Sequence, residues 1–312
     1  MIFSKLVEPW KSKDPYREIR MGLHAGMGQL VVGMTDLPRS CWAAGLSEDM
    51  KQPVLIICSA AEAAKTTYSD LTSLMPEGHV FYFPQVDLLP YEVYARNVEI
   101  AAQRMTVLTK LARQEPVIVV APVDALIKKT VSPDTIKEYS LSLSMGQKID
   151  IRELAGRLVS MGYGKEDLAE IPGTFSVRGG IIDIFSLTEN YPFRLEFFDD
   201  EIESIRYFHP DTQRSLEEIS NIYLPPADEF PANSARLVAA GKKLANEFSS
   251  VLPSYSGAAR RHLKDKISPY LEQMEQGIWT LGMEQFLTHF YTDAGGLADY
   301  LPRDGLVIMH EP

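Results

Sequence analysis

Two stretches decide the fold of the middle of this chain: Pro172-Gly-Thr-Phe-Ser-Val-Arg-Gly-Gly-Ile-Ile-Asp-Ile-Phe185 and Pro192-Phe-Arg-Leu-Glu-Phe-Phe-Asp-Asp-Glu-Ile-Glu-Ser-Ile-Arg206. Each alternates apolar and polar residues in the period of two that is typical of β-strands. Gly-Gly and Asp-Asp pairs separate the runs, and both pairs are common in tight turns. The pattern predicts three or four short antiparallel strands.

The same alternation places a large aromatic residue on the polar face of one strand. Residues 193–198 put Arg194, Glu196 and Phe198 on one side, so Phe198 breaks the polar pattern. In the preceding strand the alternation adds Arg178 to that face. Arginine and aromatic residues are enriched at protein interfaces, which favours a binding face. A strand buried on both sides, with Phe198 in a second core, fits the pattern equally well.

Composition sets broad limits on the protein. The 312 residues predict two or three domains, and 45% hydrophobic with 23% charged residues is ordinary for a globular protein. No run approaches the roughly 20 apolar residues of a membrane span, and the first ten residues lack a signal-peptide pattern. Cys41 and Cys58 predict no disulfide framework, and the histidines show no metal-ligand spacing. We therefore expect a cytoplasmic protein without metal or cofactor.

Charge argues against nucleic-acid binding by the chain as a whole. The formal net charge is −11, whereas phosphate binding requires a basic surface. Binding of nucleic acid by a local basic patch is still an alternative, because one predicted helix carries five basic residues: Arg260, Arg261, His262, Lys264 and Lys266. Such a run is more often a solvated face than a binding site.

The first part of the chain alternates helices with uniformly apolar strands, which indicates a parallel sheet covered on both faces. After about residue 134 an amphipathic helix at 151–161 leads into the antiparallel strands, and residues 226–301 are mostly helical with a break at 253–257. The expected parallel strands are 29–33, 54–58, 80–83, 116–121 and 305–309, and the expected helices are 15–27, 61–73, 99–113 and one that begins near Arg39.

The segment after the first predicted strand stands where a phosphate-binding loop would lie. Such a loop has the pattern Gly, any four residues, Gly, Lys, and Ser or Thr. The glycines allow the backbone N–H groups to surround the phosphates. Gly33 and Ser40 have the required offset, but Pro38 replaces the second glycine and Arg39 replaces the lysine. Proline has no N–H to donate, and Asp36 adds negative charge. The segment is interpreted as a relic loop rather than an active nucleotide site.

Other signs of catalysis are weak. The last predicted strand ends in His310-Glu311, where a metal-positioning strand of this class should end in Asp-Glu. The acidic run 199–203 directly follows a strand and is interpreted as turn charge. We expect no catalytic residue in this chain.

The runs 173–185, 194–206 and 211–215 resemble the N-terminal module of the bacterial transcription-repair coupling factor family, Mfd, which is itself similar to the excision-repair protein UvrB. The resemblance covers essentially the whole chain. Further support comes from Leu89-Pro-Tyr-Glu92, Gln103-Arg-Met105 and Pro116-Val-Ile-Val-Val-Ala-Pro-Val123. The chain departs from UvrB in its broken phosphate loop. About ten residues between Glu92 and Ala102 are also too few for the long DNA-threading hairpin of UvrB.

The resemblance implies an α/β fold of three domains. A degenerate helicase-like domain of the P-loop type, with a parallel sheet, would span 1–116 plus 303–312. A mostly helical domain inserted into it would span 117–134 plus 226–302. A small antiparallel α+β domain, inserted in turn, would span 135–225.

The resemblance also implies a partner. The small domain of the family binds UvrA, and the family's contact residues match Arg178, Arg194 and Phe198, which the alternation places on one face. Because the resemblance and the alternation select the same three residues, a binding face is favoured over a second core around Phe198. RNA polymerase and DNA would be bound by regions beyond this chain, which in the full protein form an ATP-dependent translocase. Other domains of the full protein would mask the UvrA face in an autoinhibited state.

The expected function is a non-catalytic module that recruits UvrA to stalled RNA polymerase for nucleotide excision repair. One alternative is a UvrB-like ATP-dependent DNA-processing enzyme, against which the loop at Gly33, Arg39 and Ser40 argues. Another is a chiefly autoinhibitory domain of the full-length translocase.

Overall fold

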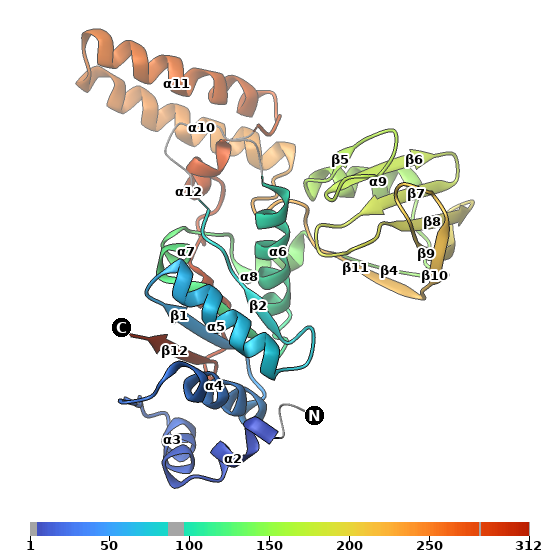
Figure 1. Cartoon of the computed structure of the whole chain (residues 1–312). Helices are drawn as coiled ribbons and strands as arrows, with labels where there is room; N and C mark the ends of the chain where they lie inside the picture. Colours follow the sequence, from blue (N-terminus) through green and yellow to red (C-terminus); the bar gives the residue numbers. More distant parts are fainter. Residues whose placement is uncertain (1–4, 87–96, 281, 312) are drawn as a thin grey trace. The chain divides into compact units, whose positions relative to one another are not determined.

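The computed structural model describes residues 5–86, 97–280 and 282–311, which divide into two compact units (Figure 1). The first unit comprises residues 1–86, 110–128 and 296–312, and the second comprises 87–109 and 129–295. The second unit contains both the antiparallel strands and the long helices. The sequence-based division into three domains therefore stays a prediction. Residues 89–92, which contributed to the resemblance, lie outside the described residues.

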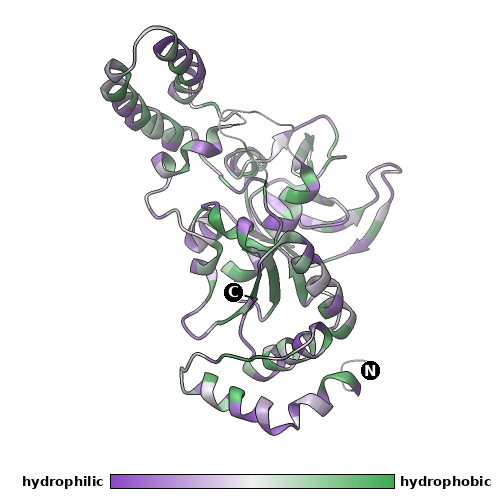
Figure 2. Cartoon of the chain, turned by 60° about the vertical axis from the view of Figure 1, so that its left-hand side comes forward, coloured by the Kyte–Doolittle hydropathy of each residue, from purple (hydrophilic) through white to green (hydrophobic). Residues whose placement is uncertain are grey.

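A parallel sheet forms the centre of the first unit. Within the described residues it has four strands, in the order β12 (Leu306–His310), β1 (Val54–Cys58), β3 (Ile118–Pro122) and β2 (Val80–Tyr82). Val54 and Ile56 pack with helices α4 (Asp36–Met50) and α5 (Ala61–Leu74), and Leu55 on the opposite face is fully buried too. Burial on both faces explains why the central strands β1 and β3 are uniformly apolar (Figure 2), whereas Val307 and Met309 of the edge strand β12 are exposed.

Four of the five predicted parallel strands are confirmed, and the strand predicted at 29–33 is wrong. Residues 29–33 belong to no helix or strand, and the side chains of Leu30 and Val32 are 85% and 83% exposed. A strand needs a hydrogen-bonded neighbour, and none of the described strands pairs with this segment. Helix α4 begins at Asp36, earlier than expected, because Pro38 is tolerated in a first helical turn.

An antiparallel sheet, as predicted, lies in the second unit, within the part of it that we call the small domain (residues 141–224). Its central strands are β6 (Thr174–Arg178), β7 (Ile181–Phe185), β8 (Phe193–Phe198) and β9 (Glu201–Phe208), with β5 (Gly164–Lys165) and β10 (Ser215–Glu218) at the edges. The short strand β5 runs parallel to its neighbour β6. A second sheet pairs β4 (Leu141–Ser144) with β11 (Asn221–Leu224).

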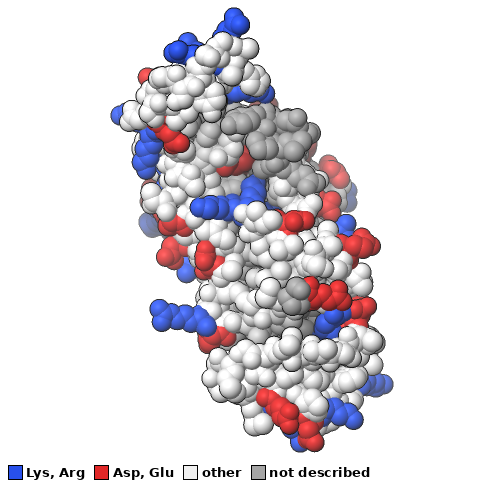
Figure 3. Space-filling view, turned by 90° about the vertical axis from the view of Figure 1, so that its left-hand side faces the viewer, with Lys and Arg blue, Asp and Glu red and all other residues white. Residues whose placement is uncertain are grey.

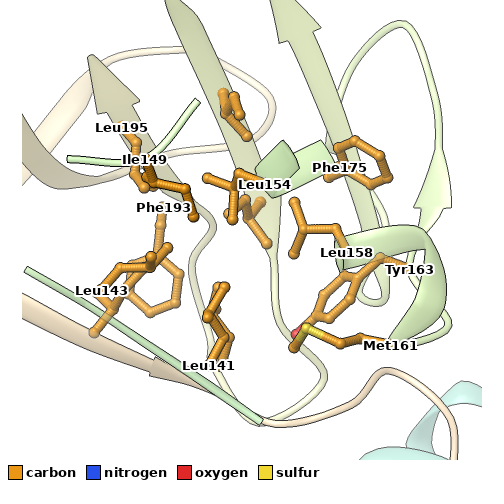
Figure 4. Packing of buried hydrophobic residues seen from close by; sticks show 14 of the residues in the cluster. Leu141, Leu143, Ile149, Leu154, Leu158, Met161, Tyr163, Phe175, Phe193 and Leu195 are labelled. Atoms are coloured by element: carbon orange, nitrogen blue, oxygen red, sulfur yellow. The ribbon is translucent and has the colours of Figure 1, made fainter. Parts of the chain in front are cut away.

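One face of the six-stranded sheet carries the core of this domain. Helix α9 (Ile151–Ser160) buries Leu154 and Leu158 against Phe175, Phe193 and other apolar residues of the sheet (Figure 4). Asp150 begins the helix by accepting hydrogen bonds from two backbone amides, which satisfies donors that a helix start leaves free. The opposite face of the sheet has no such covering helix among the described elements and is therefore the open face.

The predicted helical segment forms a long hairpin. Helices α10 (Ser234–Val251) and α11 (Gly257–Glu275) pack side by side, joined across the predicted break by a short 3₁₀ turn, Leu252–Ser254 (Figure 1). A Cβ atom on Gly241 would lie 2.8 Å from the Cβ of Met274, so glycine permits this close approach. The remaining helices are α2 (Glu8–Lys11), α3 (Asp14–His24), α6 (Val98–Ala112), α7 (Val123–Ile127), α8 (Pro133–Glu138) and α12 (Leu287–Phe290), with 3₁₀ turns at Met283–Phe286 and Leu297–Tyr300.

Two phenylalanines on one strand should differ sharply in their contribution to stability. Phe193 is 1% exposed and its ring lies 4.9 Å from that of Tyr207, whereas Phe198 is 76% exposed. Truncating a buried phenylalanine to alanine costs about 3–5 kcal/mol. We expect a cost of that size for Phe193→Ala and a change within about 0.5 kcal/mol for Phe198→Ala. Hydrogen exchange of the β7 and β8 amides measures the free energy of unfolding of both variants. Equal costs would contradict the assignment of faces.

Candidate functional site: the open face of the six-stranded sheet

Strand register brings the three predicted binding residues to one face. Asp183 on β7 stands directly opposite Arg194 on β8, and Arg178 on β6 stands opposite Ile181, two residues before Asp183. Directly paired residues project to the same side of a sheet, as do residues two apart on a strand. Phe198, four residues beyond Arg194, therefore shares the open face, which lies opposite the core of the domain.

A buried carboxylate joins the two arginines. Asp183 is 1% exposed, and its two oxygens accept hydrogen bonds from Nε and a terminal nitrogen of Arg194 at 2.7 and 2.8 Å. Arg178 donates a further hydrogen bond to Asp183 at 2.5 Å. A two-pronged arginine–carboxylate pair fixes direction as well as distance. Asp183 therefore sets the position of both guanidinium groups.

Arg194 is held more firmly than Arg178. Its terminal nitrogen also donates to the side-chain oxygen of Gln213 at 2.8 Å, and its guanidinium carbon lies 4.3 Å from the ring centre of Phe208. The hydrogen bond to Asp183 raises the pKa of Arg194 above its ordinary value. The Arg194 side chain is 14% exposed, against 44% for Arg178. Arg178 is thus the arginine with room to turn toward a partner.

The arginine cluster carries a surplus of positive charge. Two guanidinium groups share the single carboxylate of Asp183, which leaves one positive charge without a counterion in the cluster. The next polar group on the face, Glu196, accepts hydrogen bonds from Arg206 at 2.5 Å and from Ser204 at 3.0 Å. Its negative charge is therefore already balanced by Arg206. A partner that offers one carboxylate would complete the balance.

Phe198 is exposed because its surroundings provide nothing to cover it. The ring is 76% exposed, which excludes the interpretation that places it in a second core. Opposite this end of β8 the chain turns through Gly179 and Gly180, where Gly180 accepts a backbone hydrogen bond from Phe197 at 2.8 Å. Neither glycine has a side chain to shield the ring. The turn beyond Phe198 passes through Asp199, whose φ of +57° suits a two-residue hairpin turn.

The patch formed by Arg178, Arg194 and Phe198 has dimensions suited to one small contact surface. Phe198 lies four positions beyond Arg194 along β8, a distance of roughly 13 Å. Arg178 lies two strands from β8, roughly 10 Å away. These spans fit within one side of an ordinary protein–protein interface.

The phosphate-loop position of the first unit is engaged with the protein's own charges. Gly33 has the left-handed φ of +82°, and Ser40 is 4% exposed within α4. Arg39 forms ion pairs with Asp36 and, at 3.8 Å, with Glu311, which follows β12. The cation that would meet a phosphate is therefore already neutralised.

A thiol and an imidazole lie beside this position. The sulfur of Cys58, the last residue of β1, is 3.7 Å from Nδ1 of His310, the last residue of β12. Burial raises the pKa of the Cys58 thiol and lowers the pKa of the His310 imidazole, with Arg39 lowering the latter further. Both groups therefore favour their neutral forms. Within the described residues, no group of three or more His, Cys, Asp or Glu side chains is placed to hold a metal ion.

Sequence reasoning missed three residues that support the open face: Asp183, Phe208 and Gln213. Asp183 could have been found, because a carboxylate within the run Ile-Ile-Asp-Ile-Phe signals a buried charge that needs partners. Phe208 and Gln213 carry no such signal, since their contact with Arg194 depends on how β9 and the following turn fold back. No helix in the described part of the chain is long and apolar enough to cross a membrane.

Removing the charge of Asp183 should destabilise the small domain. Asp183→Asn leaves two guanidinium groups without their shared carboxylate, and breaking a buried pair in this way costs about 3 kcal/mol or more. Arg178→Ala should cost about 1 kcal/mol or less, because Arg178 is partly exposed and Arg194 still neutralises Asp183. Urea unfolding followed by hydrogen exchange in β6–β8 compares the two variants. A cost for Asp183→Asn no larger than that for Arg178→Ala would contradict this account.

Comparison with known proteins identifies the small domain first. Residues 141–230 match the family model described as the UvrB interaction domain. This range contains the arginine cluster, Phe198 and Gln213. Over 96% of its length the chain is 33% identical to the transcription-repair-coupling factor of Bacillus subtilis, covering 26% of that protein.

Two further relatives carry the same name. The transcription-repair-coupling factor of Haemophilus influenzae is 30% identical over 84% of this chain and 22% of its own length, and that of Myxococcus xanthus is 29% identical over 96% and 25%. The chain therefore spans about a quarter of the length of the curated relatives that it matches. By these matches the chain is similar over nearly its whole length to transcription-repair-coupling factors, and residues 141–230 match the UvrB interaction domain.

Proposed function

We propose that this chain is a non-catalytic UvrB-like module that recruits UvrA during transcription-coupled nucleotide excision repair. The observation that carries the proposal is an exposed phenylalanine, Phe198, beside two arginines fixed on a buried carboxylate, within a domain that matches the UvrB interaction domain. In a full-length relative, an ATP-driven translocase outside the matched region would engage DNA and stalled RNA polymerase. The present module would then bring UvrA to the lesion.

In the proposed contact, each of three side chains has a different role. Phe198 fills an apolar pocket of UvrA, since a buried aromatic anchor is the commonest source of interface energy. Arg178 turns toward a UvrA carboxylate and uses the surplus positive charge of the cluster. Arg194 stays on Asp183 and Gln213 and presents a preformed guanidinium surface. In the resting full-length protein, other domains would cover this face, which makes masking and recruitment two states of one surface.

The remaining part of the proposal concerns the first unit. We assign its parallel sheet to a degenerate helicase-like domain of the P-loop type, in which Arg39 replaces the phosphate-binding lysine. The ion pairs of Arg39 with Asp36 and Glu311 support this assignment, because a phosphate group would have to displace both. The domain would then serve as a scaffold and not as a nucleotidase.

Substitution of the arginine and the phenylalanine should weaken UvrA binding. Truncating one anchor typically costs about 2 kcal/mol, which is about thirtyfold in Kd. We expect Arg178→Ala/Phe198→Ala to raise the Kd for UvrA by at least that factor, as measured by isothermal titration calorimetry. The matched control is Arg157→Ala/Val159→Ala, which removes one arginine and one apolar side chain from exposed positions of α9.

The control pair should bind UvrA as the wild type does. Equal affinity of wild type and Arg178→Ala/Phe198→Ala, with hydrogen exchange showing an intact sheet, would overturn the proposed contact. Equal losses in both pairs would assign the effect to something other than the open face.

The purified chain should not bind ATP at physiological concentrations. Pro38 removes a backbone donor, and Arg39 is neutralised by carboxylates, so the loop has lost two of its interactions with phosphate. Titration with Mg²⁺-ATP and a fluorescent ATP analogue measures the affinity. Micromolar binding would favour the alternative of a UvrB-like ATP-dependent enzyme.

A further inference from the structure

The helical hairpin of α10 and α11 has an apolar inner side and a charged tip. Leu244 of α10 and Ile267 and Met274 of α11 are buried between the helices. Beyond them the hairpin opens to solvent, and residues 253–262 are all exposed. The tip therefore contributes little to the core of the second unit, and its composition is free to serve another purpose.

Three basic residues share one flank of α11 at this tip. Successive residues of a helix are separated by about 100°, so Arg260, Arg261 and Lys264 fall on neighbouring positions one turn apart. The inward-facing Ile267 lies to the side of this group. We call these three residues the basic flank. All three are exposed, and no ion pair to any of them is seen among the described residues. Figure 3 shows basic side chains at the top of the view, where the hairpin lies.

The N-terminal surroundings of the basic flank add to its positive potential, and the acidic residue next to the flank on α11 is Asp265, four positions after Arg261. Helix α11 begins at Gly257, its first turn holds no acidic residue, and Ser256 makes no side-chain cap. The helix dipole therefore adds partial positive charge at the same end. The side chains of Ala258 and Ala259 are small, which leaves room for a large anion, and the ring of Tyr255 is 45% exposed.

We propose that the basic flank binds the phosphate backbone of duplex DNA without sequence preference. The chain carries a net charge of −11, so three exposed cations in one place are a local exception that general solubility does not require. Guanidinium groups match phosphate oxygens in a two-pronged geometry, and phosphate contacts of this kind carry no sequence information. The proposal departs from the expectation that DNA is bound only by regions beyond this chain.

DNA suits this surface better than an acidic protein does. A protein partner would require a central apolar or aromatic anchor that becomes buried on binding. The first turn of α11, Gly257–Ala259, offers only small side chains there, and the hydroxyl of the exposed Tyr255 that precedes it can itself donate to a phosphate. A duplex backbone needs no such anchor, because its affinity comes from the release of counterions. The surface is also separate in sequence from the open face that the proposed function assigns to UvrA.

The test is fluorescence anisotropy of a labelled 20-base-pair duplex titrated with the whole chain at 50–200 mM NaCl. Three phosphate contacts predict a slope of about −2.7 in log K against log salt, and hence a roughly 40-fold loss of affinity across that range. Arg260→Ala/Arg261→Ala should reduce the magnitude of the slope by about 1.8. The matched control, Lys242→Ala/Lys243→Ala, removes two exposed charges from α10 of the same hairpin and should leave the slope unchanged.

Three outcomes would overturn the proposal. The first is a wild-type chain with no measurable affinity for the duplex at 50 mM NaCl. The second is an equal change of slope in the two double variants, which would indicate diffuse attraction without a site. The third is tighter binding to poly-glutamate than to the duplex, which would assign the basic flank to an acidic protein. Because all four residues are exposed, circular dichroism should show both variants to be folded.

Discussion

The candidate site depends on one constraint, which is that a buried carboxylate must be neutralised. Asp183 is almost fully enclosed in the sheet, and an unpaired charge there would cost several kcal/mol. Arg194 and Arg178 meet that requirement from the two neighbouring strands. A pairing that stabilises the sheet thereby fixes the geometry of two cations at its surface. The same hydrogen bonds hold the strands together and fix the two guanidinium groups, so a change at Asp183 should also lower the stability of the sheet.

In the first unit, polar and charged side chains gather at the carboxyl ends of the parallel strands. In parallel sheets, ligands bind near the carboxyl ends of the strands. Here those ends carry Cys58 and His310 in their neutral forms, and Arg39 is paired with Glu311 across the same region. Nδ1 of His310 faces the sulfur of Cys58, whereas its Nε2 is buried without a hydrogen-bond partner among the described residues. Charged and polar side chains at this edge of the parallel sheet therefore contact one another.

Local sequence patterns predicted much of this structure, and the failures have a common physical cause. Period-two alternation correctly placed Arg178, Arg194 and Phe198 on one face, because side-chain direction along a strand depends only on the backbone. The strand expected at 29–33 failed because pairing requires a neighbour that the apolar run itself does not specify. Gln213 and Phe208 were missed for the same reason, since their contact with Arg194 arises from distant parts of the chain. Single-strand geometry was predictable, whereas contacts between strands were not.

The placement of Phe198 on a strand also bears on how quickly the surface can act. Phe198 stands at the end of β8, whose backbone pairs with β9 on one side, while the amide of Phe197 donates a hydrogen bond to the carbonyl of Gly180 on the other. Binding surfaces on loops must lose about 1–2 kcal/mol of backbone entropy for each residue that becomes ordered. A surface made of paired strands has already met that cost during folding. Encounter with a partner then requires only the reorientation of side chains, which favours rapid association.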